Sequence, residues 1–169
     1  MAVHVVVMGV SGCGKSVVGN AIAAEMGLPM IEGDAFHPPS NVEKMRRGQP
    51  LQDADRAGWL ARLGEELALH PEGAVLACSA LKRAYRDVLR SHSAHVKFIH
   101  LELSQDEALR RVAERGGHFY PPSLVASQFA ALENPAGEAG VLAVAATLPV
   151  VEITRLASHW LRSVAFNNP

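Results

Sequence analysis

Several features are scarce in this chain, and each scarcity excludes a class of protein. Cysteine occurs only twice, at Cys13 and Cys78, which is too few for the disulfide framework of a small extracellular domain. No apolar run approaches the roughly 18 residues of a membrane helix, and the strand expected from Val3 leaves no room for a signal peptide. Basic and acidic residues number 16 and 17, so the charge balance indicates no polyanionic partner. We therefore expect a soluble, cytoplasmic protein with no nucleic-acid or membrane partner.

The length and the composition fit one domain. A chain of 169 residues is long enough for one well-packed core and too short for two. Apolar residues make up 49% of it, which argues against disorder. The eight histidines are scattered without the spacing of metal ligands. We therefore treat residues 1–169 as a single domain.

The segment Gly9–Ser16 carries the most specific local motif. It reads G-x-x-x-x-G-K-S and directly follows the apolar run Val3–Met8. A strand, a glycine-rich loop and a helix in this order let backbone N–H groups and the helix dipole cradle phosphate oxygens. In such loops Lys15 can reach the β- and γ-phosphates, and the Ser16 hydroxyl can ligate Mg²⁺. The motif predicts a nucleoside triphosphate site; the alternative is a chance glycine-rich turn.

Continuous apolar runs predict the strands of a parallel sheet. They are Val3–Met8, Pro29–Ile31, Ala74–Cys78, Val96–Leu101 and Leu148–Ile153. Helical patterns separate them: Gly27 should end the first helix, and Ser104–Glu107 forms a capping box that begins another. This alternation predicts an α/β fold with a five-stranded parallel sheet covered by helices on both faces. Ligands of such folds bind at the carboxyl ends of the strands.

Asp34 follows the second predicted strand and should face the phosphate loop Gly9–Ser16 across that crevice. A carboxylate there can accept the proton of an attacking hydroxyl or help to order a metal ion. An Asp that caps the next turn is an equally good interpretation of the spacing.

Three further segments carry cationic side chains toward the same crevice. In Asn41–Leu60, Arg56 is the best candidate to hold an anionic group, because it lies beside apolar residues near a helix start. Ser79–Arg83 follows the third strand and either points polar groups at the ligand or caps a helix. Arg111, Arg115 and Gly116–Phe119 either form a basic lid over the nucleotide or merely end a helix with favourable charges.

Taken together, these motifs resemble the gluconate kinase family of small P-loop carbohydrate kinases. The resemblance runs through most of the chain, and Cys13 stands where the family loop often has Ser. It is carried by G-V-S-G-C-G-K-S at Gly9–Ser16, G-D-A-F-H-P at Gly33–Pro38, the block Asn41–Leu60, C-S-A-L-K-R-A-Y-R at Cys78–Arg86, and the block Gly117–Glu133.

The resemblance implies ATP-dependent phosphorylation of D-gluconate on its terminal 6-hydroxyl, with Mg²⁺, on a three-layer P-loop kinase fold with a lid at about residues 115–133. It implies Lys15, Asp34 and Arg115 as catalytic residues, and it favours a homodimer. The expected nucleotide contacts are Gly9, Ser11, Gly12, Cys13, Gly14, Lys15, Ser16, Val17 and Arg111, with Ser16 as the metal ligand. The expected contacts of the polyol acid are Asp34, His37, Arg56, Lys82 and Arg86.

Two other functions share the phosphate loop. A shikimate kinase is the nearest enzyme, but Glu32-Gly33-Asp34 replaces its paired-Asp motif, and Ser79-Ala80-Leu81 stands in place of its glycine triplet. A nucleotide-dependent switch would carry the guanine-specifying N-K-x-D pattern, which this sequence lacks. Asp55–Gly58 matches the switch motif D-x-x-G, but no apolar strand precedes it, so we interpret that match as chance.

Overall fold

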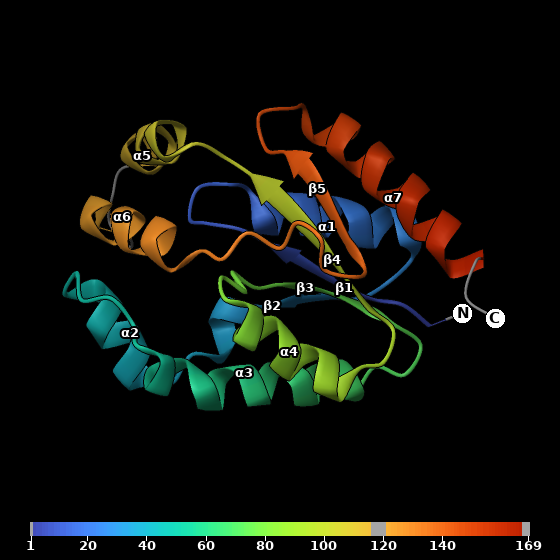
Figure 1. Ribbon diagram of the computed structural model, residues 1–169, viewed down its shortest axis with the longest axis horizontal. Helices are drawn as coiled ribbons and strands as arrows, with labels where there is room; N and C mark the ends of the chain where they lie inside the picture. Colours follow the sequence, from blue (N-terminus) through green and yellow to red (C-terminus); the bar gives the residue numbers. More distant parts are fainter. Residues whose placement is uncertain (1, 116–120, 167–169) are drawn as a thin grey trace.

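The computed structural model describes residues 2–115 and 121–166. Its centre is a sheet of five parallel strands in the order β2-β3-β1-β4-β5 (Figure 1). The strands are β1 (His4–Met8), β2 (Met30–Glu32), β3 (Ala74–Ala77), β4 (Val96–Glu102) and β5 (Val141–Ala145). The expected five-stranded parallel sheet is confirmed.

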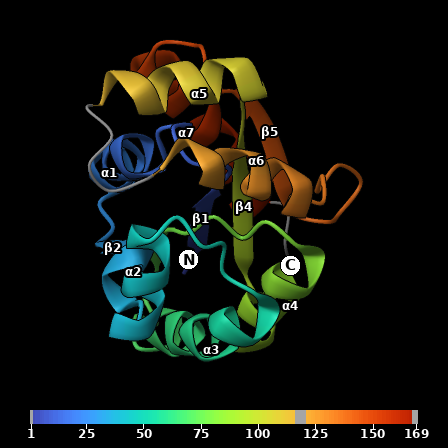
Figure 2. The same ribbon diagram turned by 90° about the vertical axis from the view of Figure 1, so that its left-hand side faces the viewer.

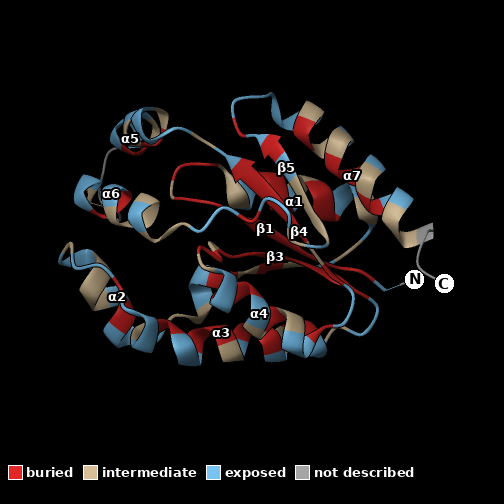
Figure 3. Ribbon diagram, viewed as in Figure 1, coloured by how far each residue is buried: buried red, intermediate tan, exposed pale blue. Residues whose placement is uncertain are grey.

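Helices cover both faces of this sheet, so the molecule has three layers (Figures 1 and 3). The helices are α1 (Lys15–Met26), the short 3₁₀ helix η1 (Gly33–Phe36), α2 (Pro39–Arg46), α3 (Asp53–Ala68), α4 (Arg83–His92), α5 (Gln105–Glu114), α6 (Pro122–Ala131) and α7 (Val150–Phe166). One core packs α1, α5, α6 and α7 against the sheet, and a second core packs α3 and α4 against its other face.

Strand β1 shows why a continuous apolar run was needed at the centre of the sheet. All five of its residues are buried, between β3 on one side and β4 on the other. Successive side chains alternate between the faces: Val5 and Val7 belong to one core, while Val6 and Met8 belong to the other.

The predicted fifth strand was placed wrongly. Residues Leu148–Ile153 lie at the start of α7, and the fifth strand is Val141–Ala145. Pro149 precedes the helix, and its carbonyl accepts the N–H groups of Glu152 and Ile153, at 2.9 and 3.0 Å. Exposure then follows a helical period, with Val151 78% exposed and Ile153 1%. The true strand lies at the sheet edge and is rich in alanine, which weakens its strand signal.

Two predicted helix ends are confirmed. Gly27 ends α1 in the left-handed conformation, at φ 67°, and the Ser104 hydroxyl accepts the Glu107 N–H at 3.2 Å as the cap of α5. Helix α3 begins at Asp53 and is capped by Gln52, whose N–H donates to the Asp55 carboxylate at 2.8 Å. The segment 34–52 contains most of η1 and the whole of α2.

This topology brings the loops after β1, β2 and β3 to one end of the sheet. Figure 2 looks onto that end, where α2, α3, α5 and α6 surround the phosphate loop. The Gly9 N–H donates to the Ser79 carbonyl at 3.3 Å, which ties the loop after β1 to the loop after β3. Among the residues described, no helix is both long and apolar enough to cross a membrane.

Candidate functional site

A cleft of about 790 Å³ opens at this end of the sheet. Its walls come from the phosphate loop, η1, α2, α3, the loop after β3, α5 and α6. Of the predicted site residues, those lining it are Ser11, Gly12, Gly14, Lys15, Ser16, Val17, Asp34, His37, Arg56 and Arg115. Those that do not line it are Gly9, Cys13, Lys82, Arg86 and Arg111. The structure therefore brings most of the predicted residues together.

The phosphate loop needs its glycines for conformation and for space. Gly9, Gly12 and Gly14 have φ values of 145°, 85° and 95°, which L side chains rarely adopt. A Cβ on Gly9 would also lie 2.8 Å from the Cys13 sulfur and 2.9 Å from the Leu101 carbonyl oxygen. Cys13 itself is buried and contributes packing below the loop. Any phosphate contact of Gly9 or Cys13 must therefore come from the backbone.

Lys15 and Ser16 begin α1 at the floor of the cleft. The Lys15 ammonium donates to the carbonyls of Gly9 and Val10, at 3.1 and 3.2 Å. These two carbonyls hold the charge at the loop, within reach of a phosphate that enters the cleft.

The side chains that could hold Mg²⁺ lie beside Lys15. The Ser16 hydroxyl donates to the Glu32 carboxylate at 2.5 Å. A hydroxyl paired with a carboxylate fits Mg²⁺, which takes few protein oxygens and fills its shell with phosphate and water. No cluster of three or more His, Cys, Asp or Glu side chains suited to a metal occurs among the described residues, which is consistent with such a partial shell.

Asp34 lines the same cleft as the phosphate loop. Its side chain is 80% exposed, so the carboxylate is free to meet a ligand. Gly33 before it packs so closely on β3 that a Cβ would collide with the Ala77 carbonyl oxygen. The Gly33 carbonyl accepts the Trp59 indole N–H at 2.8 Å. These two contacts fix the backbone from which Asp34 projects.

His37 lies against Asp34 and is held from three sides. Its ring stacks on Trp59 with centroids 4.1 Å apart, and its Nε2 lies 3.8 Å from the Asp34 carboxylate. The Asn41 amide donates to the Asp55 carbonyl at 2.8 Å and has its second N–H directed at His37 Nδ1, at 3.2 Å. Nδ1 must then accept, so the proton resides on Nε2 and faces Asp34. Burial lowers the pKa of His37 below its ordinary value of 6.5 and thereby favours this neutral form. The nearby Asp34 carboxylate opposes that effect.

Arg56 is the buried cation of the cleft wall. Its Nη1 donates to the Leu51 carbonyl at 2.8 Å and to the Tyr85 hydroxyl at 3.3 Å. Tyr85 in turn donates to Asp53, which also accepts from Lys82 at 2.9 Å. The Tyr85 and Lys82 hydrogen bonds lower the pKa of Asp53. A chain of hydrogen bonds thus connects Lys82 to Arg56 through Asp53 and Tyr85.

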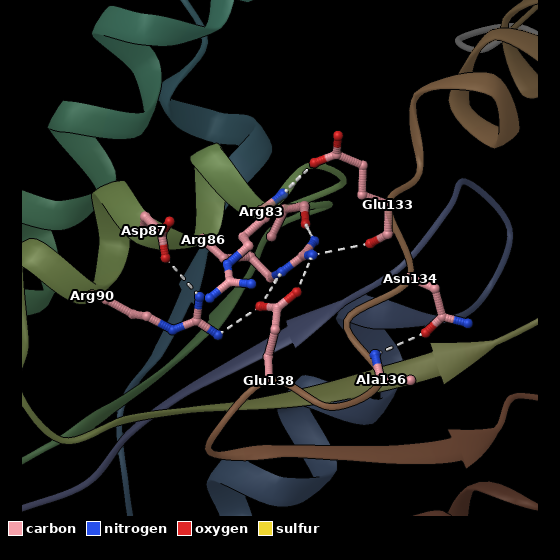
Figure 4. A network of polar contacts seen from close by, with 9 residues as sticks. Arg83, Arg86, Asp87, Arg90, Glu133, Asn134, Ala136 and Glu138 are labelled. Carbon is pink, nitrogen blue, oxygen red and sulfur yellow. Dashed lines mark hydrogen bonds and ion pairs between the residues drawn. The ribbon is translucent and has the colours of Figure 1, made fainter.

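Arg86 lies outside the cleft, in a buried ion-pair network that joins α4 to the segment after α6 (Figure 4). Its guanidinium meets the Glu138 carboxylate at 2.6 and 3.0 Å, the Ala80 carbonyl at 2.7 Å and the Glu133 carbonyl at 3.0 Å. Arg90 adds a bond to Glu138 at 2.8 Å. The Arg86 hydrogen bond, followed by that of Arg90, lowers the pKa of Glu138 to about 2. The expected acceptor contact of Arg86 does not fit this arrangement, because its side chain is fully buried and four of its five N–H donors are already engaged.

The residues expected to form a lid differ in what they do in the structure. Arg111 reaches the Gly12 carbonyl at 3.1 Å and the Ala146 carbonyl at 3.0 Å, so it braces the outer side of the phosphate loop. Arg115 ends α5, is exposed and lines the cleft. Gly116–Tyr120 lie outside the described residues. The rest of the expected lid is mainly helix α6, which lines the cleft through Leu124, Ser127 and Gln128.

Three residues of this site were missed by the sequence reasoning. Glu32 pairs with Ser16, Trp59 stacks on His37, and the Gln128 Oε1 accepts the Ser11 N–H at 2.6 Å. Glu32 directly follows the predicted strand Pro29–Ile31, and Gln128 lies within the block Gly117–Glu133 that carries the family resemblance. Their positions in the sequence could therefore have identified both residues. Trp59 has the appearance of an ordinary core residue, and it is 3% exposed.

Comparisons with known proteins agree with this geometry. The family model described as shikimate kinase matches residues 11–130. The gluconokinase of Gluconobacter oxydans is 47% identical over 92% of this chain and 89% of its own. The thermosensitive gluconokinase of Escherichia coli is 44% identical over 77% of this chain and 71% of its own.

A solved structure extends the agreement to three dimensions. The crystal structure of a gluconokinase from Sinorhizobium meliloti is 49% identical, superposes with a TM-score of 0.90, and pairs 97% of this chain with 94% of that one. Identity at this level over nearly the whole chain shows the family as well as the fold. The chain therefore carries a shikimate kinase-family domain and belongs to the gluconokinase family.

Proposed function

We propose that this protein transfers the γ-phosphoryl group of ATP to the 6-hydroxyl of D-gluconate. The observation that carries the proposal is the shared cleft: the phosphate loop, Asp34 and Arg56 all line it. The names of its gluconokinase relatives support gluconate as the acceptor.

The donor end supplies positioning and charge. Backbone N–H groups of the phosphate loop are suited to hold phosphate oxygens, and the Lys15 ammonium has only to leave the Gly9 and Val10 carbonyls to join them. Such preorganised donors stabilise the charge that develops in phosphoryl transfer.

Ser16 and Glu32 are the residues that would hold Mg²⁺. When bound, the ion would neutralise triphosphate charge and help to align the phosphates. The Ser16 hydroxyl can donate its proton to Glu32 and still offer an oxygen lone pair to the ion.

The acceptor end suits a small polyhydroxy acid. Arg56 is held by its Nη1 contacts, so the rest of its planar guanidinium is pre-oriented to bind a carboxylate in the cleft. Asp34 is exposed opposite the phosphate loop and is suited to accept the proton of the attacking hydroxyl. The neutral His37, with Nε2–H facing Asp34 at 3.8 Å, leaves the negative charge of that carboxylate in place.

The remaining predicted residues take supporting roles in this proposal. Lys82 and Arg86 support Arg56 and the Cys78–Lys82 loop instead of touching the acceptor. Arg115 stands at the cleft mouth, where closure would bring its charge toward the transferring phosphoryl group. We retain a single domain, a cytoplasmic location and a homodimer as proposals; the last two rest on composition and on the family resemblance.

A coupled ADP-release assay with gluconate, with shikimate and with no acceptor tests the proposal. The shikimate arm is included because the shikimate kinase model matches the chain. We expect turnover with gluconate that exceeds the other two arms by at least about 100-fold, since a site built for one set of hydroxyls strongly rejects another. Equal ADP release without an acceptor, or faster release with shikimate, would refute the assignment.

A further inference from the structure

The side chain of Gln128 reaches from α6 across the cleft into the phosphate loop. Its Oε1 accepts the Ser11 N–H at 2.6 Å, although the two residues are 117 positions apart. A backbone N–H can only donate, so it is the oxygen end of the amide that meets the loop. A donor of the phosphate loop is thus already occupied by a protein side chain.

The backbone that carries Gln128 is firmly held. Leu124 and Val125 of the same helix are buried. Beyond the helix, the Glu133 N–H donates to the Leu81 carbonyl at 2.8 Å, and the Glu133 carboxylate accepts the Arg83 N–H at 2.8 Å. A ligand that enters the loop would therefore meet an anchored helix, from which the Gln128 amide extends.

A phosphate oxygen that accepts the Ser11 N–H has to displace the Gln128 oxygen, because both are acceptors for one donor. The amide also carries two N–H donors, and its terminal torsion is broad and roughly two-fold. Rotation of that torsion would present Nε2 to the phosphate that displaced Oε1.

We propose that Gln128 is a phosphoryl-contacting catalytic residue. Its oxygen holds the Ser11 N–H while the cleft is empty, and its NH₂ group donates to the triphosphate once nucleotide binds. This inference rests on the proposed function for its substrate, and it adds a donor from α6 to those of the phosphate loop. Gln128 lines the same cleft as Lys15 and Asp34.

Two nearly isosteric variants separate the acceptor and donor roles. Q128E keeps an acceptor for Ser11 but replaces the donor with negative charge, whereas Q128M removes both roles. Q105E on the exposed first turn of α5 is the matched control for an added carboxylate, since Gln105 lies outside the cleft. The affinity for a non-hydrolysable ATP analogue is measured by calorimetry without an acceptor, and kcat is measured with gluconate.

We expect Q128E to weaken analogue binding at least about tenfold, because a carboxylate holds the N–H more strongly and repels the triphosphate. The weakening should shrink as the pH is lowered and the introduced carboxylate becomes protonated. Q128M should bind the analogue within about threefold of Q105E but lose about 100-fold in kcat, the scale for one lost transition-state donor. The proposal would be overturned if both variants bound the analogue and turned over gluconate within threefold of Q105E. It would also be overturned if Q128E and Q128M lost equal amounts of analogue affinity and of kcat.

A wild-type measurement covers the case in which a variant fails to fold. In ¹⁵N NMR spectra, the side-chain NH₂ signals of Gln128 should shift when the ATP analogue is added, and unmoved signals would also overturn the proposal. Neither binding measurement uses gluconate. They therefore stand even if gluconate proves not to be the acceptor, an outcome that the ADP-release assay reports separately.

Discussion

The donor and acceptor halves of the cleft are built by different means. In the donor half, Gly9–Val17, one short segment supplies the backbone donors, the lysine and the hydroxyl, and three glycines with positive φ set its shape. In the acceptor half, Asp34, His37, Arg56 and Trp59 come from η1, its C-terminal flank and α3, and side-chain contacts hold them.

This difference decides how each half tolerates change. A backbone cradle depends on conformation, so it is sensitive to substitution of its glycines. A cradle of side chains depends on partners, so that Tyr85, Asp53 and Lys82 affect the acceptor through Arg56. Substitutions in the two halves should therefore change different kinetic parameters, such as kcat for Lys15 and the KM for gluconate for Arg56.

The largest effect should come from the donor half. Lys15→Ala removes the cation nearest the phosphates, and we expect kcat to fall by at least about 1,000-fold, the scale of a lost phosphoryl-charge clamp. Thermal unfolding should change little, because the Lys15 ammonium bonds only groups of the phosphate loop itself, the Gly9 and Val10 carbonyls and the Cys13 sulfur. A kcat near that of the wild type would remove Lys15 from its assigned role.

The next largest effect should come from Asp34. Asp34→Asn keeps the size of the side chain and removes the base, so kcat should fall about 100-fold or more while analogue binding by calorimetry stays within a few-fold. Equal losses in kcat and in nucleotide affinity would instead assign Asp34 to the organisation of the metal.

Arg56 and Lys82 provide a matched pair within the acceptor half. Arg56→Met should raise the KM for gluconate by tens-fold, the scale of a lost charged hydrogen bond, whereas Lys82→Met should raise it only a few-fold. Steady-state kinetics on both variants gives the comparison. A larger KM effect from Lys82 would show that it touches the acceptor directly.

The smallest effect on catalysis should come from the ion pair outside the cleft. Glu138→Gln leaves the buried Arg86 charge without a carboxylate, and breaking such pairs costs about 3–5 kcal/mol of unfolding free energy. In the wild type, the pKa of Glu138 is lowered from 4.5 to about 2, so its stabilisation is present above pH 4.5 and is lost as the pH falls toward 2. Urea unfolding between these pH values should show that loss in the wild type and less of it in E138Q, with kcat at neutral pH nearly unchanged. A collapse of kcat in the folded variant would contradict the structural role.

The sequence predicted these regions unevenly, for physical reasons. The fold class, four strands and the phosphate loop could be predicted, because apolar runs and glycine spacing are local signals. The fifth strand could not, because Pro149 and the helical period of α7 outweighed an apolar run, while alanine hid the true strand. Arg86 and Lys82 were expected to contact the acceptor, but neither lines the cleft, because each is engaged by a carboxylate that is distant in sequence, Glu138 and Asp53. Only three-dimensional contacts distinguish a bound side chain from a free one.

The most direct test of the account is the identity of the product made by the wild-type enzyme from ATP, Mg²⁺ and D-gluconate. ³¹P–¹H correlation NMR shows which carbon carries the new phosphate. We predict coupling to the C6 protons only, with ADP formed in equal amount. Phosphate on another carbon, or inorganic phosphate with gluconate unchanged, would contradict the claim that this cleft aligns the donor with the terminal hydroxyl.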